Sequence, residues 1–301
     1  MNILIRADSS STIGTGHIMR DLVLAKQFEN SKIIFAVQDL AGNINYKITE
    51  AGYNLEILKS ANIGELEALV KEKNIDMLVI DHYDIDFEFE KRLKQQNPAL
   101  KIFVLDDTYE KHHCDILLNH NIYAKKSKYK ELVPSSCEVR CGSKQTLLRD
   151  EFHKEKAKAI PKTKSKNIKI FIAMGGADTQ NLNIKILEVI KDFDHVKAVV
   201  VTTSANKNLE DLKEYAKEKK WIKLYINSEK IAKLMRKSDF GIITPSVSAN
   251  EAYFMKLSFI AIKTADNQGE MYKFLKKNGF GVMGRFSKKK LNSMVKEMIK
   301  K

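Results

Sequence analysis

The chain has few cysteines for its length: three in 301 residues, Cys114, Cys137 and Cys141. Such a small, odd number excludes the disulfide frameworks that hold small secreted domains together. The segment "HHC" at 112–114 could supply zinc ligands together with Cys137 and Cys141. However, no cysteine pair has the C-x-x-C spacing that makes a zinc site specific. We favour the alternative, buried thiols beside a polar loop, and expect no metal.

Long hydrophobic runs are also missing. The longest, such as "MLVI" and "AVVV", fall far short of the roughly 20 residues that a membrane-spanning helix needs. The first residues, "MNILIRADSSS", carry a charge inside their short apolar run and lack the apolar core of a secretory signal. Low-complexity tracts do not occur either. We therefore expect a globular, cytoplasmic protein that has no membrane partner.

Positive charge, in contrast, is in excess. The 52 Lys and Arg outnumber the 38 Asp and Glu and give a net charge of +14. Such a charge favours anionic partners, which include nucleotides, nucleic acid and anionic lipid. The lysines are scattered among glutamates, as in "KEYAKEKK", which is typical of solvated helix faces. Since no basic stripe interleaved with aromatic residues is present, we expect no nucleic-acid partner.

Short apolar runs alternate with amphipathic segments through most of the chain. The expected strands are 2–6, 33–37, 76–80, 101–105, 115–118, 168–174, 196–201, 222–226, 240–244 and 258–262. The expected helices are 17–29, 64–73, 86–96, 181–191, 207–220, 229–237, 248–256 and 268–277. This alternation predicts the α/β class, with parallel sheets that helices cover on both faces.

A lysine-rich segment, residues 153–167, separates two such series and has the composition of a linker. We therefore predict two doubly wound, Rossmann-like domains, 1–155 and 165–301, which face each other across a cleft. The amphipathic segment 287–301 is expected to cross back and pack on the first domain. We expect the protein to be a monomer.

Polar loops follow the expected strands at their carboxyl ends, where open parallel sheets bind ligands. In the first half, "DHYD" follows strand 76–80 and brings Tyr83, a candidate sugar contact. In the second half, "NSEK" follows strand 222–226 and begins with Asn227, a candidate substrate contact. Arg149, in "LLRDEF", is a candidate anion or sugar contact. An ordinary polar loop or surface arginine is the alternative for each of these residues.

The first of these loops, "SSTIGTGHIMRD", contains Gly14, Gly16 and His17. As a dinucleotide-binding fingerprint it would have Met19 where the third glycine belongs, and a simple capped turn is a further alternative. A reactive loop fits better, because the positive end of a helix disfavours a cation and favours a neutral imidazole. His17 could then act as a general base. Asp8, Asp81 and Asp107 are candidates to orient it by their loop positions.

Two loops of the second half suggest a nucleotide site. The pair Gly175–Gly176 in "MGGAD" lets backbone amides approach a phosphate. Ser248, Asn250 and Glu251 in "TPSVSANEA" place polar groups at a helix start, and a glutamate can accept hydrogen bonds from two vicinal ribose hydroxyls. A Gly-Gly turn and a well-capped helix are the alternatives for the two loops taken singly.

Several motifs together resemble those of a known family. They are "IRADSSSTIGTGHIMRDLVLA", "IDHYDID", "DDTYEKHHCDILLN", "VPSSCEVRCG", "LLRDEF", "AMGGADTQNL" and "SVSANEA", in order over the whole chain from Asn2 to about Lys277. They resemble the UDP-sugar hydrolases of pseudaminic acid biosynthesis. Those enzymes cleave UDP-2,4-diacetamido-2,4,6-trideoxy-β-L-altropyranose, and they are similar to two-domain glycosyltransferases of the GT-B type.

The resemblance implies a division of labour between the two domains. UDP would be held by the second domain, at Gly175–Gly176 and at the helix start with Asn250 and Glu251, and the sugar would lie near His17. A histidine in the opening glycine loop is the catalytic base of the family, and His17 occupies that place. The resemblance implies neither a cofactor nor a metal.

Other classes stay open from the sequence alone. A GT-B glycosyltransferase would share the fold and the UDP site but pass the sugar to an acceptor hydroxyl. An NAD-dependent oxidoreductase would need a small residue at Met19 and an acidic residue after the second strand, where Gln38–Asp39 is a loose match. A nucleic-acid-binding module is compatible with the net charge of +14.

Overall fold

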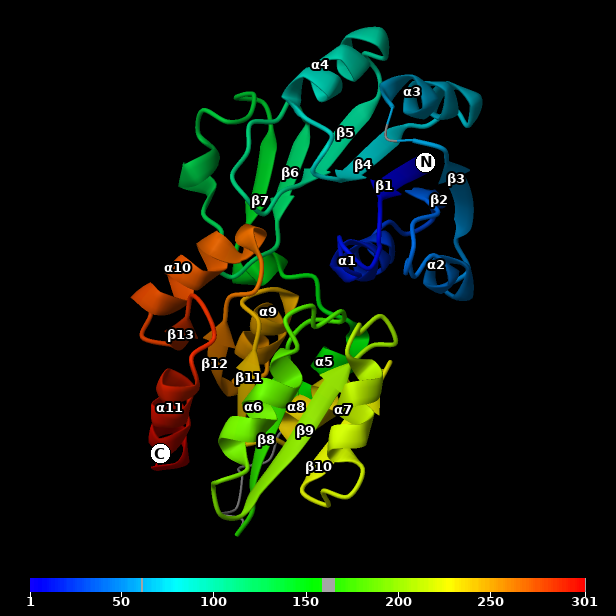
Figure 1. Ribbon diagram of the computed structural model, residues 1–301. Helices are drawn as coiled ribbons and strands as arrows, with labels where there is room; N and C mark the ends of the chain where they lie inside the picture. Colours follow the sequence, from blue (N-terminus) through cyan, green and yellow to red (C-terminus); the bar gives the residue numbers. More distant parts are fainter. Residues whose placement is uncertain (61, 159–165, 301) are drawn as a thin grey trace. The chain divides into compact units, whose positions relative to one another are not determined.

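The protein consists of two compact α/β units. A computed structural model describes residues 1–60, 62–158 and 166–300 (Figure 1). The chain divides into Met1–Leu147, the first unit, and Leu148–Lys301, the second unit. In each unit helices flank a central sheet (Figure 1).

The first unit is built around a seven-stranded parallel sheet with the order β3-β2-β1-β4-β5-β6-β7. Its elements are β1 (Asn2–Ala7), α1 (Gly16–Ala25), β2 (Lys32–Gln38), α2 (Tyr46–Glu50), β3 (Asn54–Leu58), α3 (Ile63–Glu72), β4 (Met77–Asp81), α4 (Phe87–Gln96), β5 (Lys101–Leu105), β6 (Ile116–Asn119) and β7 (Glu138–Cys141). All five strands expected in this half are present.

The two edge strands of this sheet, β3 and β7, were not expected from the sequence. Their sequences, "NLEIL" and "EVRC", mix charged and apolar residues, and most of their side chains are only partly buried or exposed. An edge strand has one free side and less cover, so it lacks the continuous apolar run that marks a central parallel strand.

Alternate side chains of β1 enter the two hydrophobic layers of the first unit. Ile3 and Ile5 point into one layer, where Ile18 of α1 packs with them. Leu4 points into the other, where it joins Leu66 of α3. Each of these side chains is at most 2% exposed, and burying one contributes about 1.5–3 kcal/mol. The period-two alternation of the strand therefore holds helices on both faces of the sheet.

The second unit contains a six-stranded parallel sheet with the order β10-β9-β8-β11-β12-β13. Its elements are α5 (Asp150–Ala157), β8 (Ile168–Ala173), α6 (Leu182–Ile190), β9 (Val196–Thr202), α7 (Leu209–Ala216), β10 (Ile222–Ile226), α8 (Ile231–Arg236), β11 (Phe240–Ile243), α9 (Val247–Phe254), β12 (Ser258–Ile262), α10 (Gly269–Lys277), β13 (Gly281–Met283) and α11 (Lys288–Lys300). The two doubly wound sheets predicted from the sequence are confirmed.

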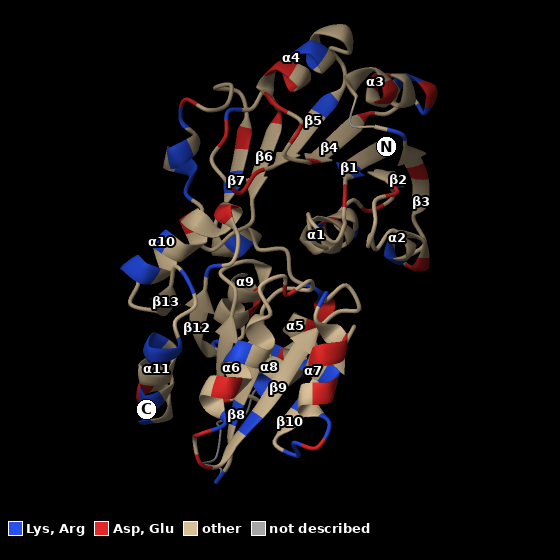
Figure 2. Cartoon of the chain, viewed as in Figure 1, with Lys and Arg blue, Asp and Glu red and all other residues tan. Residues whose placement is uncertain are grey.

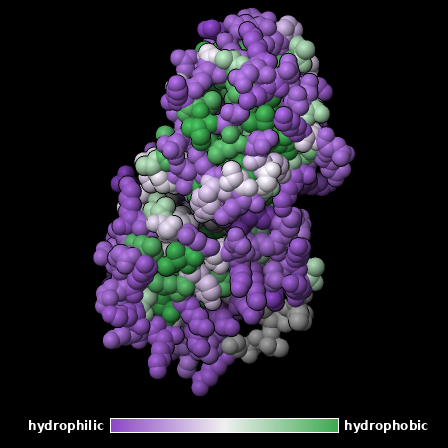
Figure 3. All heavy atoms as spheres, turned by 90° about the vertical axis from the view of Figure 1, so that its right-hand side faces the viewer, coloured by the Kyte–Doolittle hydropathy of each residue, from purple (hydrophilic) through white to green (hydrophobic). Residues whose placement is uncertain are grey.

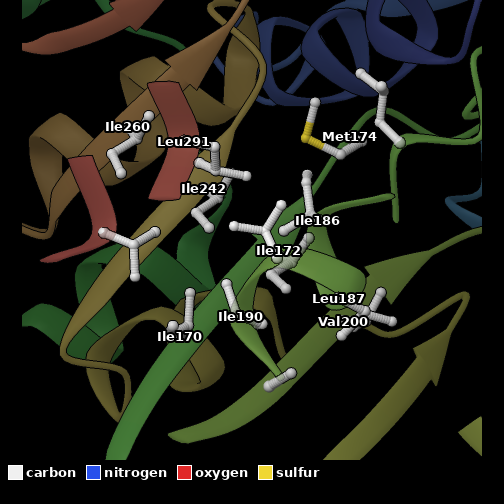
Figure 4. Close-up of a cluster of buried hydrophobic side chains, with 14 of the residues drawn as sticks. Ile170, Ile172, Met174, Ile186, Leu187, Ile190, Val200, Ile242, Ile260 and Leu291 are labelled. Atoms are coloured by element: carbon white, nitrogen blue, oxygen red, sulfur yellow. The ribbon is translucent and has the colours of Figure 1, made fainter. Parts of the chain in front are cut away.

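One large hydrophobic core fills a face of the second sheet (Figure 4). Ile170 and Ile172 of β8 and Ile242 of β11 meet side chains of α6, including Ile186. Leu291 of α11 lies in the same cluster (Figure 4). These residues are completely buried.

The prediction that the C-terminal helix packs on the first domain is wrong. Leu291 and Val295 of α11 are fully buried in the core of the second unit, and α11 packs against α6. These two residues are four apart, so they lie on one helix face. An amphipathic pattern indicates that a helix covers an apolar surface, but the pattern does not identify that surface.

The division between the units comes before α5, whereas the sequence suggested a linker over 153–167. Helix α5 packs against α8, and Arg236 of α8 donates a hydrogen bond to Glu155 at 2.8 Å. The lysines of α5 gave this part of the sequence the composition of a linker, so the helix was not predicted. Residues 159–165 of the expected linker lie outside the described residues.

Charged residues of both signs are spread over the helices of each unit. Figure 2 shows basic and acidic positions on the same helix in α4 and α6. The face of the molecule drawn in Figure 3 is mostly hydrophilic, with scattered hydrophobic areas. Within the described ranges, no helix is both long and apolar enough to cross a membrane.

Replacement of Leu291 by alanine should destabilise the second unit by about 2–5 kcal/mol, because truncating a fully buried leucine leaves a cavity. Trp221 packs against the same core and is the one tryptophan of the chain, so its fluorescence during urea unfolding measures this loss. The control Lys289→Ala, at an exposed position of α11, should change stability by less than about 0.5 kcal/mol. Equal stabilities of the two variants would contradict the packing of α11.

Candidate functional site

Both sheets reverse their strand order beside their first strand. In the first unit β1 lies between β2 and β4, and in the second unit β8 lies between β9 and β11. At such a point neighbouring loops leave on opposite faces of the sheet, which opens a crevice beyond the carboxyl ends of the two strands. The candidate residues after β1, β4, β8 and β11 therefore gather at the positions where doubly wound sheets bind ligands.

The opening loop is a closed turn that ends in the first residues of α1. Ser10 and Gly14 exchange backbone hydrogen bonds of 3.2 and 2.9 Å. Gly14 has a φ of +89°, a left-handed conformation that favours glycine. Gly16 is the first residue of α1 and places His17 in the first helical turn, as the sequence predicted.

His17 lies against the end of β4. Its side chain is 9% exposed, and its Nδ1 is 3.0 Å from the backbone oxygen of Asp81 and 3.3 Å from Oδ1 of the same residue. Both partners are acceptors, so Nδ1 carries the proton and the lone pair of the neutral ring is on Nε2. Among the three aspartates named as candidates to orient His17, Asp81 is the one that contacts it.

Arg20 holds Asp81 in place. It follows His17 by three residues, so both side chains lie on one face of α1. Its Nε donates to Oδ2 of Asp81 at 2.6 Å, and its Nη2 donates to Oδ1. Its Nη1 donates to Asp107 at 3.1 Å. Burial works in the opposite direction, but Arg20 and His17 hold the pKa of Asp81 below its ordinary value.

Tyr83 extends over the histidine from the loop after β4. Its hydroxyl donates to Asp107 at 3.0 Å, and its ring meets that of His17 edge-on, with centroids 5.1 Å apart. The side chain is nevertheless half exposed, since 49% of the residue is accessible. Tyr83 therefore combines a contact with His17 and an aromatic surface open to solvent.

A second buried ion pair anchors this loop. Arg6 donates two hydrogen bonds to Asp8, at 2.7 and 2.8 Å, and both residues are buried in the sheet. Nε2 of His82 donates to Asp8 at 3.0 Å, while its Nδ1 accepts the N–H of Asp84. Burial is outweighed by His82 and Arg6, which hold the pKa of Asp8 far below its ordinary value. Asp8 thus fixes the backbone on either side of Tyr83.

Two further titratable residues lie near Asp81 and were not identified from the sequence. Asp21 is fully buried, and neither of its carboxyl oxygens has a hydrogen-bond partner in the described residues. Burial and the adjacent Asp81 raise its pKa well above the ordinary range. His120 accepts the N–H of Leu147, and burial together with Arg20 lowers its pKa to about 3. His120 is therefore uncharged near neutral pH, and the guanidinium of Arg20 pairs with Asp81 and Asp107.

In the second unit, the glycine pair after β8 forms a tight turn. Gly175 has a φ of +82°, in the left-handed region. A Cβ added to Gly176 would come within 3.0 Å of Oγ1 of Thr203, which donates to the Gly176 carbonyl at the same distance. Larger residues at these positions would strain the loop, so the pair keeps the backbone accessible beside β8.

The two helix starts near this turn differ in one important respect. Both carboxylate oxygens of Asp178 cap α6, because they accept the N–H groups of Leu182 at 2.7 Å and Asn183 at 3.0 Å. Helix α9 has no side-chain cap at Ser246, whose hydroxyl is instead hydrogen-bonded to Thr244. The start of α9 is thus the better place for an anion.

The polar residues of α9 are largely buried within the second unit. Asn250 and Glu251 are buried, and Ser248 is partly buried one turn earlier. Nη2 of Arg149 lies 3.3 Å from Oε1 of Glu251, so the structure brings together two residues that the sequence placed in separate motifs. Burial raises the pKa of Glu251 to about 7, against the influence of Arg149.

Asn227 lies apart from these residues, at the end of β10. Its φ is +51°, and its side-chain oxygen accepts the N–H of Ser204 at 3.0 Å. The amide thereby ties the loop after β9 to β10. A substrate contact by Asn227 stays a prediction.

The cysteines and histidines considered as zinc ligands have other partners. Nδ1 of His112 is 2.7 Å from Glu90, and the sulfur atoms of Cys114 and Cys137 are 3.6 Å apart. Over the described part of the chain, no group of three or more His, Cys, Asp or Glu side chains has an arrangement that could hold a metal ion.

Arg20 is the residue of the site that sequence reasoning missed most clearly. The available signal was its spacing: an arginine three residues after a candidate base shares its helix face. Asp21 and His120 gave no such signal, because their burial results from tertiary packing.

Comparison of the fold with solved structures defines the class of protein. MurG of Acinetobacter baumannii superposes with a TM-score of 0.66 at 12% identity, over 99% of this chain and 90% of that one. The spinosyn rhamnosyltransferase SpnG gives a TM-score of 0.67 at 10% identity, over 100% and 92%. The UDP-GlcNAc 2-epimerase of Neisseria meningitidis gives 0.64 at 13% identity, over 100% and 92%. The fold is therefore that of the GT-B glycosyltransferases.

Sequence comparison defines the family. The chain is 43% identical to the UDP-2,4-diacetamido-2,4,6-trideoxy-β-L-altropyranose hydrolase of Campylobacter jejuni, over 94% of this chain and 98% of the relative. It belongs to the family of that UDP-sugar hydrolase. An uncharacterised protein of Methanocaldococcus jannaschii is 30% identical, over 92% of this chain and 59% of that protein. No protein-family model matches the chain.

Replacement of Arg20 by methionine should destabilise the first unit by about 3–5 kcal/mol, because the buried Asp81 carboxylate would lose its partner. Adding Asp81→Asn should restore part of that loss, since an amide leaves no unpaired charge. Urea unfolding followed by far-UV circular dichroism measures both variants. If Arg20→Met lowers the free energy of unfolding by less than about 1 kcal/mol, the Arg20–Asp81 pair does not hold the site in place.

Proposed function

We propose that the protein hydrolyses UDP-2,4-diacetamido-2,4,6-trideoxy-β-L-altropyranose to UDP and 2,4-diacetamido-2,4,6-trideoxy-L-altrose. Membership of the hydrolase family supports this substrate and reaction. The observation that carries the proposal is the position of His17, whose Nδ1 is directed at Asp81 beside the strand-order reversal of the first sheet.

His17 is the proposed general base. With its proton on Nδ1, the ring has the lone pair on Nε2 available for a proton from water. The water oxygen forms a bond to the anomeric carbon while the bond from that carbon to the phosphate oxygen breaks. The proton passes to Nε2, and UDP leaves with the bonding electrons. Direct displacement inverts the anomeric configuration, and such base assistance contributes roughly 10²–10⁴ in rate.

UDP is proposed to bind the second unit. The Gly175–Gly176 turn and the uncapped start of α9, which includes Ser248, offer backbone amides to the two phosphates. Asn250 and Glu251 are the proposed contacts of the nucleoside. Because UDP is a good leaving group, this arrangement needs less help from a general acid than the hydrolysis of a glycoside does.

The sugar is proposed to lie against the opening loop and Tyr83. Gly14 and Gly16 have no side chains to obstruct the approach of the acetamido groups. Tyr83 presents a half-exposed ring next to His17, which suits a sugar with apolar deoxy and acetyl faces. In this proposal the first unit supplies the base and the sugar contacts, and the second supplies the UDP contacts.

Replacement of His17 by phenylalanine should lower kcat by about 10²–10⁴ while leaving the Kd for UDP within about threefold, because the base and the nucleotide contacts lie on different elements. The matched control is His113→Phe, whose ring packs on Phe87 in the first unit. The control should retain kcat. Near-normal turnover by His17→Phe would exclude His17 as the base.

The bond that breaks can be identified with isotope-labelled water. Hydrolysis in ¹⁸O-water should place the label in the sugar, and NMR should detect the inverted anomer first. Turnover should need no acceptor besides water. Label in the phosphate would mean attack at phosphorus, and dependence on an acceptor hydroxyl would favour a glycosyltransferase instead.

A further inference from the structure

Glu251 is a buried carboxyl group, and its charged neighbours among the described residues, Arg149 and Glu151, come from the N-cap and first turn of α5. On α9 itself, the flanking Asn250 and Ala252 are buried and uncharged. From α5 and its N-cap, Arg149 and Glu151 face the carboxyl group. The other titratable residues that α5 directs at α9, His153 and Lys156, lie against the ring of Phe254.

Arg149 is fixed between the two glutamates. Its Nη1 is 3.0 Å from Oε1 of Glu151, and its Nη2 is 3.3 Å from Oε1 of Glu251. Its guanidinium also lies over the ring of Phe152, 5.2 Å from the centroid. Glu151 is held in turn, because its Oε2 accepts the N–H of Ala232 at the start of α8. Three contacts thus define where the guanidinium lies, and the hydrogen bond from Ala232 of α8 holds one of its partners.

We propose that Arg149 is a positioning residue that, by its contact with Glu251, favours the carboxylate form of that residue and aims it at the ribose hydroxyls of the nucleotide. This inference rests on the proposed function of the second unit as the UDP-binding unit. It differs from the expectation that Arg149 contacts an anion or sugar directly, because the guanidinium is occupied by the two carboxylates.

Glu251 needs a positively charged neighbour because it is buried, and burial disfavours its carboxylate form. Burial raises the pKa of this carboxyl group to about 7, Arg149 opposes the rise, and Glu151 adds to it. Without Arg149, the pKa would rise further, and most Glu251 would be protonated at neutral pH. A protonated carboxyl group has lost acceptor capacity, so it binds two vicinal hydroxyls less well than a carboxylate does.

The pH dependence follows from the sign of this shift. Only the ionised form binds the ribose well, so the affinity for UDP should fall as the pH drops through about 7. In a variant without the guanidinium, the same fall should occur at higher pH. The two proteins should therefore differ most near neutral pH and converge in alkaline solution.

The test is the Kd for UDP, measured by calorimetry between about pH 6 and pH 9, for the wild type, Arg149→Met, Arg149→Lys and Glu251→Gln. We expect Arg149→Met to bind about tenfold more weakly at pH 7 and within about threefold of the wild type at pH 9. Arg149→Lys should restore most of the affinity, since it retains the charge. Glu251→Gln should bind weakly with little dependence on pH.

Binding of uridine, measured by NMR titration, distinguishes the proposal from direct contact with phosphate. If Arg149 acts through Glu251, Arg149→Met weakens uridine and UDP by similar factors at pH 7. A loss confined to UDP, or one that is equal at every pH, overturns the proposal. Circular dichroism spectra that match the wild type exclude misfolding of the variants. Failure of the wild type to bind UDP would instead reject the proposed function itself.

Discussion

The strand order of the two sheets is the constraint on which the site depends. Each sheet reverses its strand order beside its first strand, which is the position where doubly wound sheets bind ligands: between β1 and β4 in one unit and between β8 and β11 in the other. Residues from loops far apart in the sequence then lie together, as His17 and Asp81 do across 64 positions. The sheet therefore brings the hydrogen-bond acceptor of His17, the proposed base, next to the start of α1.

Within the first unit, the ion pair of Arg20 and Asp81 is the buried pair that contacts His17. Arg20 occupies both oxygens of Asp81. Burial raises the pKa of the neighbouring Asp21 and lowers that of His120, because it disfavours the ionised form of each. A buried ion pair of this kind adds little net stability, but its geometry orients whatever else it contacts. Here it contacts Nδ1 of His17. Arg6 and Asp8 do the same for the loop that carries Tyr83.

In the second unit, the proposed task is the binding of an anion beside a polar nucleoside. Asp178 uses the first amides of α6, whereas the N-cap Ser246 of α9 makes no side-chain capping hydrogen bond within the described residues, so the start of α9 is the better place for a phosphate. In the proposal Glu251 of α9 binds ribose as a carboxylate, but this residue is buried where a negative charge is costly. Arg149, from the N-cap of α5, compensates that cost. The Arg–Glu contact therefore connects the packing of α5 with the proposed recognition of the nucleotide.

Much of this could be predicted from the sequence because it follows local rules. Buried parallel strands are continuous apolar runs, so the central strands were predicted correctly from the sequence. Loops after such strands carry polar residues, and this rule singled out His17 and the two loops proposed to bind the nucleotide. The sequence did not predict the edge strands β3 and β7, because their side chains are only partly buried. It did not predict helix α5, whose lysines resemble a linker. It also did not predict that α11 packs on α6, because an amphipathic pattern does not specify a neighbour. The sequence alone thus determined the two doubly wound sheets and the candidate base. Only the tertiary structure decided that His17 contacts Asp81, that Arg20 pairs with Asp81 and that Arg149 contacts Glu251. Each contact joins two elements that are distant in the sequence, and their proximity depends on how the helices pack against the sheet.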